Sequence, residues 1–119
     1  MIGHAIVSHG FEATPAGVKA LACDAAARAL GWTVERPDYQ AFDKRTDVSR
    51  LGDVEARIAH LRAIAQRCTG PLVLCGSSLG AFISARVSLD VPVAGLFLMA
   101  PPIWLEDYDF ALQVARVPT

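Results

Sequence analysis

Short apolar runs and segments with helical spacing alternate along this chain. The apolar runs have the length of buried strands and are bounded by glycine or proline. Four such runs are present: residues 2–8, 32–36, 72–75 and 93–99. Between them, apolar positions recur every three or four residues, which predicts three helices: residues 14–30, 48–68 and 79–88. Strands that alternate with helices predict a parallel sheet joined by right-handed crossovers.

The spacing also predicts which helix faces are buried. The first helix is expected to start with Thr14 as its N-cap and to bury a stripe of small residues: Val18, Ala22, Ala25 and Ala29. The second helix is expected to bury a larger stripe: Val54, Ile58, Leu61, Ala65 and Cys68. Its arginines are expected on a solvated face: Arg50, Arg57, Arg62 and Arg67. Residues 38–47 are polar and irregular, and they are expected to form a loop.

The composition narrows the class of protein. With 119 residues, of which 53% are hydrophobic, the chain has the size and apolar content of one domain with a buried parallel sheet. The formal net charge of −1 gives no basic surface for nucleic acid. No apolar run approaches the ~20 residues of a membrane span, and no secretion signal is visible. The three cysteines lack a C-x-x-C spacing, so reduced thiols in a cytoplasmic protein are expected.

The most informative stretch is residues 72–81, LVLCGSSLGA, in which an apolar strand runs directly into a turn and a helix start. Its centre fits the pattern G-x-S-x-G, with Gly76, Ser78 and Gly80 at the specified positions. Glycines lack a Cβ, so strand and helix can approach closely. The turn is expected to hold Ser78 in a strained backbone conformation. It also places the Ser78 hydroxyl at the positive end of the following helix, which favours developing negative charge.

With this turn, the chain resembles the α/β-hydrolase family, in which residues 76–80 would be the nucleophile elbow. A second match is AIVSHGF at residues 5–11, which is similar to the family's first core strand and its His-Gly oxyanion loop. The resemblance implies an α/β fold with an open, mostly parallel sheet and helices on both faces. Residues 1–119 would form a single domain, the N-terminal part of that fold. The implied strand order is second, first, third, fourth, with the first helix on one face and the other two opposite.

In that order, the sheet has a switch point between the first and third strands, where ligand crevices form in open α/β sheets. The loop around Gly10 and the turn at Ser78 are therefore expected to be neighbours. The resemblance implies that Ser78 is the nucleophile; a tight turn that happens to contain a serine is the alternative. Backbone N–H groups of Phe11 and Leu79 would then hold the oxyanion.

A serine nucleophile needs a base, and the histidines of this chain are poorly placed to supply one. In the resembled family, the histidine of the His-Gly pair, here His9, shapes the oxyanion loop. His4 is expected to pack in the first strand, and His60 to lie on the surface of the second helix. No histidine follows the serine. The base and acid are therefore expected beyond Thr119, and this segment alone is expected to hydrolyse esters only slowly.

The region after the fourth strand carries further candidates. Three carboxylates follow the strand and are open as triad acids, with solvated loop positions as the alternative: Glu106, Asp107 and Asp109. Four residues are candidates for the wall of a substrate pocket, with ordinary core packing as the alternative: His9, Phe11, Ile103 and Trp104. No cofactor or metal is expected, because no G-x-G-x-x-G or phosphate-binding loop is present and the histidines and cysteines are scattered.

The sequence therefore predicts a cytoplasmic serine hydrolase that acts on a small-molecule carboxylic ester or thioester. Two alternatives stay open: a non-catalytic binding domain that keeps the fold without a triad, and a cofactor-free lyase or haloperoxidase on the same scaffold. The apolar strand at residues 93–99 would be a sheet edge if nothing covers it. An exposed apolar edge pairs readily with other chains, so a homo-oligomer also stays open.

Overall fold

The structure is a computed structural model that describes residues 3–108 and 111–119. Within these residues one sheet contains the strands β1 (His4–Ser8), β2 (Thr33–Glu35), β3 (Leu72–Ser77) and β4 (Gly95–Met99). The helices are α1 (Val18–Ala29), α2 (Gln40–Asp43), α3 (Val54–Arg67) and α4 (Leu79–Val87). Strands and helices alternate as predicted, except that the short helix α2 lies between β2 and α3.

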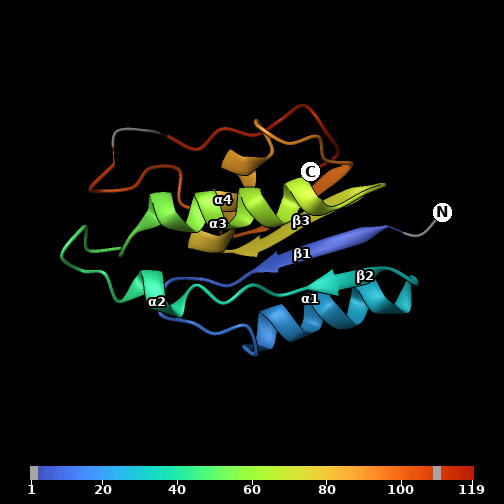
Figure 1. Ribbon diagram of the computed structural model, residues 1–119, viewed down its shortest axis with the longest axis horizontal. Coiled ribbons are helices and arrows are strands. Elements are labelled where there is room, and N and C mark those ends of the chain that lie inside the picture. The colour runs from blue at the N-terminus through green and yellow to red at the C-terminus, as the bar shows by residue number, and fades with distance from the viewer. Residues whose placement is uncertain (1–2, 109–110) are drawn as a thin grey trace.

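The strands pair in the order β2-β1-β3-β4, and each pair is parallel (Figure 1). This confirms the predicted open α/β sheet and its strand order. Ser8 at the end of β1 is level with Gly76 in β3, and Ser77 is level with Met99 in β4. The carboxyl ends of these three strands therefore meet at one edge of the sheet, beside the switch point between β1 and β3.

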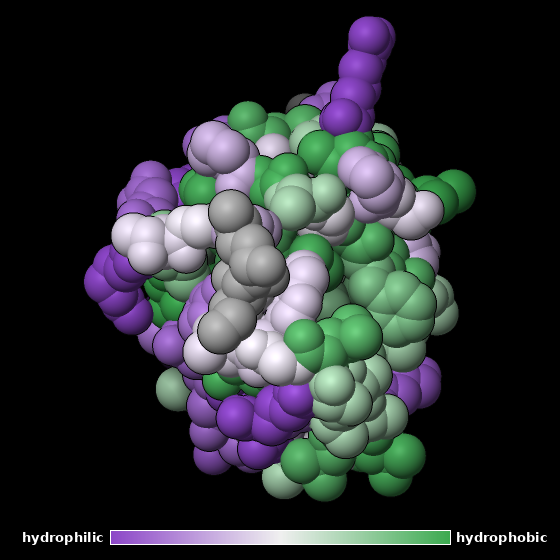
Figure 2. Space-filling view, turned by 90° about the vertical axis from the view of Figure 1, so that its right-hand side faces the viewer, coloured by the Kyte–Doolittle hydropathy of each residue, from purple (hydrophilic) through white to green (hydrophobic). Residues whose placement is uncertain are grey.

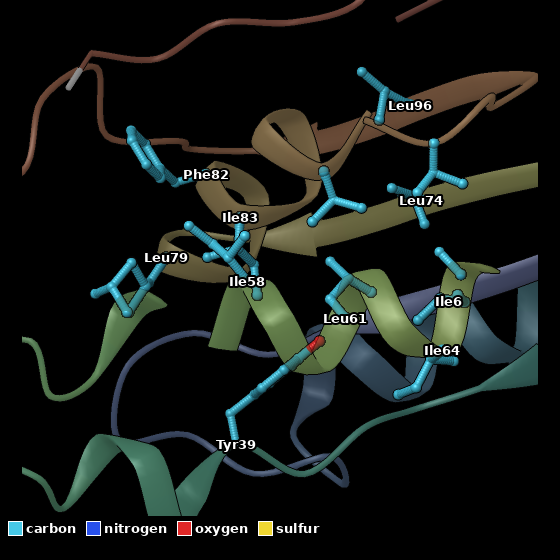
Figure 3. Close-up of a cluster of buried hydrophobic side chains, with 14 of the residues drawn as sticks. Ile6, Tyr39, Ile58, Leu61, Ile64, Leu74, Leu79, Phe82, Ile83 and Leu96 are labelled. Atoms are coloured by element: carbon cyan, nitrogen blue, oxygen red, sulfur yellow. The ribbon is translucent and has the colours of Figure 1, made fainter. Parts of the chain in front are cut away.

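Successive strand residues face two separate layers, because the side chains of a strand alternate between its faces. On one face, Ile6 and Leu74 pack among the side chains of α3 and α4 (Figure 3). On the other face, Val7 and Cys75 pack against Ala20 of α1. As predicted, α1 covers one face of the sheet, and α3 and α4 cover the other (Figure 1). Burial on both faces explains why the strands are apolar throughout.

The first helix begins later than predicted. Residues 14–17 form a turn, in which the Thr14 hydroxyl oxygen accepts the Ala16 N–H at 3.2 Å and the Thr14 carbonyl oxygen accepts the Gly17 N–H at 3.2 Å. The helix then starts at Val18, and Gly17 is its N-cap in place of Thr14. The short-range bonds of Thr14 thus stabilise a separate turn before the helix.

The buried face of α1 also differs from the prediction. The whole predicted stripe is exposed, namely Val18, Ala22, Ala25 and Ala29, whereas Ala20 and Asp24 are buried. The Asp24 carboxylate accepts hydrogen bonds from the guanidinium groups of Arg28 and Arg36. These partners compensate the burial of a charged group that hydrophobicity alone would have placed in solvent.

The region between β2 and α3 corrects two further predictions. Residues 38–47 are not all loop, because α2 lies within them and the Tyr39 and Asp43 side chains are buried. Helix α3 starts at Val54 and not at residue 48, with the Asp53 carboxylate accepting the Ala56 N–H at 3.0 Å. Arg57, predicted on the solvated face, is fully buried with 0% relative exposure.

Part of the molecular surface is apolar. Figure 2 views one end of the molecule and shows hydrophobic residues gathered along one side of this view. Leu30, Trp32 and Phe97 contribute to an apolar groove between α1 and the sheet. The edge of β4 is partly occupied, because the Leu96 N–H donates to the Pro118 carbonyl oxygen at 2.9 Å.

In the described part of the chain, none of the helices is both long enough and apolar enough to cross a bilayer.

Replacing Gly80 or Gly76 with alanine is expected to destabilise the fold by about 2–3 kcal/mol. A Cβ at Gly80 would lie 2.1 Å from the Ser8 carbonyl oxygen, and one at Gly76 would lie 2.3 Å from the Gly80 carbonyl oxygen. Because both obstacles are backbone atoms, the packing of α4 against β1 and β3 must open to admit the methyl group. Urea unfolding followed by circular dichroism measures the loss.

Gly17→Ala is the matched control, since a Cβ there meets the Thr14 carbonyl oxygen at an ordinary 3.4 Å. This control is expected to lose much less stability. An unfolding free energy for Gly80→Ala equal to that of the unsubstituted protein would contradict the close packing of helix and strand.

Candidate functional site

Ser78 occupies the turn between β3 and α4 with an unusual backbone conformation. Its φ is 56° and its ψ is −118°, a region that non-glycine residues rarely adopt. The Ser78 N–H donates to the Met99 carbonyl oxygen at 2.8 Å, and the Ser78 carbonyl oxygen accepts the N–H groups of Ala81 and Phe82 at 3.0 and 3.1 Å. Bonds on both sides of the residue therefore hold the strained turn.

The loop after β1 lies against this turn. A Cβ added to Gly10 would be 3.4 Å from the Ser78 Cβ and 3.3 Å from the Ser77 carbonyl oxygen. A larger side chain at position 10 would therefore press on the turn. The structure thus brings together two motifs that are far apart in the sequence, at the edge where the switch point lies.

A pocket of about 400 Å³ opens beside the two loops. Its lining includes residues 7–11, the start of α1, Ser77 and Ser78 of the turn, and Met99 at the end of β4. Most of the exposed surface of this lining is apolar. The pocket can therefore hold a small, largely apolar group next to the Ser78 side chain.

Two backbone N–H groups are suited to bind an anionic oxygen at this site. Leu79 is the first residue of α4, and the first N–H groups of a helix have no acceptor within it. The Phe11 N–H belongs to the loop that lines the pocket, and it donates to no acceptor among the described residues. These are the two N–H groups that the sequence predicts as oxyanion donors.

A buried ion pair lies beneath the loop. The Arg57 guanidinium donates to both carboxylate oxygens of Asp43, at 2.7 Å each. It also donates to the carbonyl oxygens of His9 and Gly10, at 2.9 and 3.0 Å. Its planar group lies 4.6 Å from the centre of the Tyr39 ring. The Arg57 guanidinium therefore contacts both the loop after β1 and the segment that carries α2.

His9 is buried and uses both ring nitrogens within the protein. Nε2 accepts the Tyr39 backbone N–H at 2.9 Å, so the proton is assigned to Nδ1, which donates to the Gly10 carbonyl oxygen at 2.7 Å. Burial lowers the pKa of His9, which favours the neutral ring. With its unprotonated nitrogen already occupied, His9 shapes the loop and is not available as a base.

The other two histidines lie elsewhere. His4 contacts the Thr33 hydroxyl at the amino end of the sheet, the opposite end from Ser78. The His60 ring packs edge-on against the rings of Tyr39 and Phe42. Neither histidine is among the described residues that line the pocket. Within the described residues, no histidine is placed to take the Ser78 proton.

The carboxylates after β4 are engaged at the surface. Asp107 accepts the Arg50 backbone N–H at 2.8 Å, and Glu106 lies 3.2 Å from the Arg50 guanidinium. Asp109 lies outside the described residues. The bonds of the first two carboxylates join the segment after β4 to the loop before α3, away from the described lining of the pocket.

Ile103 and Trp104 are not brought to the pocket. Their side chains are 76% and 60% exposed, and neither is among the described lining residues. In the described part of the chain, no group of three or more histidine, cysteine, aspartate or glutamate residues is arranged to hold a metal ion.

Sequence reasoning missed the residues under the loop: Arg57, Asp43 and Tyr39. A signal for Arg57 was present, because it lies three residues after Val54 and four before Leu61, on the apolar stripe of α3. An arginine within an apolar stripe either interrupts the buried face of the helix or is itself buried with a partner for its charge. No comparable pattern marks Asp43, because its partner is distant in the sequence.

Comparison with known proteins gives a consistent assignment. A model of the alpha/beta hydrolase family matches residues 5–118. The crystal structure of a protein from Xanthomonas campestris pv. campestris, assigned as a hydrolase of the alpha/beta superfamily, is 48% identical and superposes with a TM-score of 0.94. The match covers 98% of this chain and 68% of that protein.

A more distant structure supports the fold alone. This YdeN-like protein from Pectobacterium atrosepticum, also assigned as a hydrolase, is 19% identical and has a TM-score of 0.56. The match covers 85% of this chain and 50% of that protein. No curated protein sequence gives a significant match.

The free energy of unfolding is expected to fall between about pH 7 and pH 5, in part because of His9. Its pKa in the folded protein is lowered from the ordinary 6.5, so the unfolded chain binds more protons over this range. Protonation of Nε2 would also oppose the Tyr39 N–H, although Asp38 at 3.8 Å offsets part of the cost. Urea unfolding at both pH values measures the loss.

The His9→Gln variant is expected to lose less stability over the same pH range, because it removes this titration. His60→Gln, at an exposed position of α3, is the matched control for replacing a histidine. A loss in His9→Gln as large as in the unsubstituted protein would contradict the assignment of a neutral, buried His9.

Proposed function

Because this chain belongs to the alpha/beta hydrolase family, we propose that it is a serine hydrolase of carboxylic esters or thioesters with Ser78 as its nucleophile. One observation carries the proposal. Ser78 adopts a strained conformation at the start of α4, against a loop with an N–H group that has no acceptor among the described residues. This arrangement is the one that a hydroxyl attacking an acyl group requires.

In the proposed reaction, the Ser78 Oγ bonds to the acyl carbon, and the electron pair of the carbonyl double bond moves to its oxygen. The N–H groups of Leu79 and Phe11 donate to that oxyanion, each worth about 3 kcal/mol in the transition state. The oxyanion then collapses, and the alcohol or thiol leaves with the proton that the base took from Ser78. Attack of water on the acyl-serine releases the carboxylic acid.

The base is the part of this mechanism that the described residues do not supply. His9 is occupied on both nitrogens, and neither His4 nor His60 lines the pocket. The proposal therefore requires a histidine and its acid from outside the described residues. The experiments below use the protein as it is naturally expressed, called the natural chain. The pocket volume of about 400 Å³ and its largely apolar lining support a small acyl group as the substrate part that binds here.

A fluorophosphonate probe is expected to label the natural chain at Ser78, because only an activated hydroxyl attacks it readily. The Ser78→Ala variant is expected to lose labelling and to lower kcat for p-nitrophenyl acetate by at least about 10³-fold. Peptide mass spectrometry locates the label, and initial rates give kcat and KM.

Ser88→Ala is the matched control, since Ser88 follows the last residue of α4 and its hydroxyl donates to the Ala85 carbonyl oxygen. This variant is expected to keep both labelling and turnover. A folded natural chain with neither labelling nor Ser78-dependent turnover would reject the proposal and favour a non-catalytic binding domain on the same fold.

A further inference from the structure

We propose that Arg57, through its ion pair with Asp43, is a positioning residue that holds the oxyanion loop in its binding conformation. The oxyanion loop is defined here as residues 9–12. The inference rests on the proposed function, because it assigns a role in the same acyl-transfer site. It concerns the shape of the loop, which can also be measured without any substrate.

Arg57 holds two carbonyl groups of the oxyanion loop. The Arg57 side chain is fully buried, and its guanidinium can only donate hydrogen bonds. It donates to the carbonyl oxygens of His9 and Gly10, at 2.9 and 3.0 Å. Both carbonyl groups therefore point into the protein. The His9 ring and the Ala13 N–H also donate to the Gly10 oxygen, at 2.7 and 3.2 Å.

The planarity of the peptide bond then determines where the N–H groups of the loop point. In a trans peptide, the C=O of one residue and the N–H of the next point in opposite directions. Holding the Gly10 carbonyl inward therefore turns the Phe11 N–H outward, and holding the His9 carbonyl inward does the same for the Gly10 N–H. No peptide bond in the described chain is cis. Residues 9–11 of this loop line the same pocket as Ser78, so we infer that the outward N–H groups face that pocket.

Asp43 holds the other end of the loop. Its carboxylate accepts the Glu12 N–H at 3.1 Å, in addition to the two bonds from Arg57. Glu12 has a φ of 59°, a conformation that a residue with a side chain adopts only when its surroundings impose it. The ion pair thus contacts the chain on both sides of Phe11 and maintains a strained residue next to it.

The chemistry of the cation matters as well as its charge. The guanidinium is a planar fork whose donors match the two Asp43 oxygens and the two carbonyl oxygens at once, and its central carbon lies over the Tyr39 ring. The Tyr39 side chain is itself fixed in the core between α3 and the sheet (Figure 3). A lysine would keep the charge but could not reproduce this set of directions.

The test replaces Arg57 and Asp43 in the natural chain and measures turnover of p-nitrophenyl acetate. Arg57→Lys is expected to lower kcat by about 10- to 100-fold with KM changed by less than about twofold, because the displaced donors act in the transition state. Asp43→Asn, which keeps the shape of the residue and an acceptor for Arg57, is expected to change kcat in the same direction. Arg62→Lys is the matched control, on the same helix with a surface ion pair to Asp90.

A second measurement does not need activity. In ¹⁵N-resolved NMR spectra, the amide signals of Gly10 and Phe11 are expected to shift and their hydrogen exchange to accelerate in Arg57→Lys and Asp43→Asn, but not in Arg62→Lys. A natural chain without Ser78-dependent turnover would reject the proposed function, while these amide changes would still support the positioning role. Unchanged kcat in folded Arg57→Lys, or amide changes no larger than those of Arg62→Lys, would overturn it.

Discussion

The close approach of α4 to the end of β1 is the contact on which the site depends. Any side chain at Gly80 would place its Cβ 2.1 Å from the Ser8 carbonyl oxygen, so only glycine lets the helix start against the neighbouring strand. That contact brings the turn at Ser78 close against the loop at Gly10. The pairing of β1 with β3 already makes the two loops neighbours, and the absence of a Cβ at Gly80 lets the helix start close against the loop.

The buried ion pair between Arg57 and Asp43 acts on a second feature of the site, the conformation of the oxyanion loop. Desolvation of Arg57 and Asp43 offsets much of their mutual attraction, so such a pair contributes little net stability compared with apolar residues of similar size. Its useful property is direction, because the guanidinium orients two carbonyl groups and the carboxylate orients one N–H. A wholly apolar core could stabilise the same sheet without specifying where the loop N–H groups point.

Much of the fold could be predicted from local patterns. The strands are short apolar runs between glycines and prolines, and the order β2-β1-β3-β4 followed from the family resemblance. The pattern failed where a polar residue is buried with a distant partner. Asp24 faces the sheet because Arg36 reaches it from beyond β2, and this changes which stripe of α1 is buried. Tyr39 and Asp43 turn an apparently polar loop into part of the core.

The sequence by itself determined the turn at Ser78, because the glycine spacing and the flanking strand and helix are local, and backbone sterics act between near neighbours. It also determined that the chain's histidines are poorly placed as partners for that serine. Only the tertiary structure decided that Arg57 is buried beneath the oxyanion loop and that Ile103 and Trp104 lie away from the pocket. The physical reason is that the environment of a side chain depends on which distant segments pack around it, and hydrogen-bond partners such as Asp43 and the loop carbonyls exist for Arg57 only after the chain has folded.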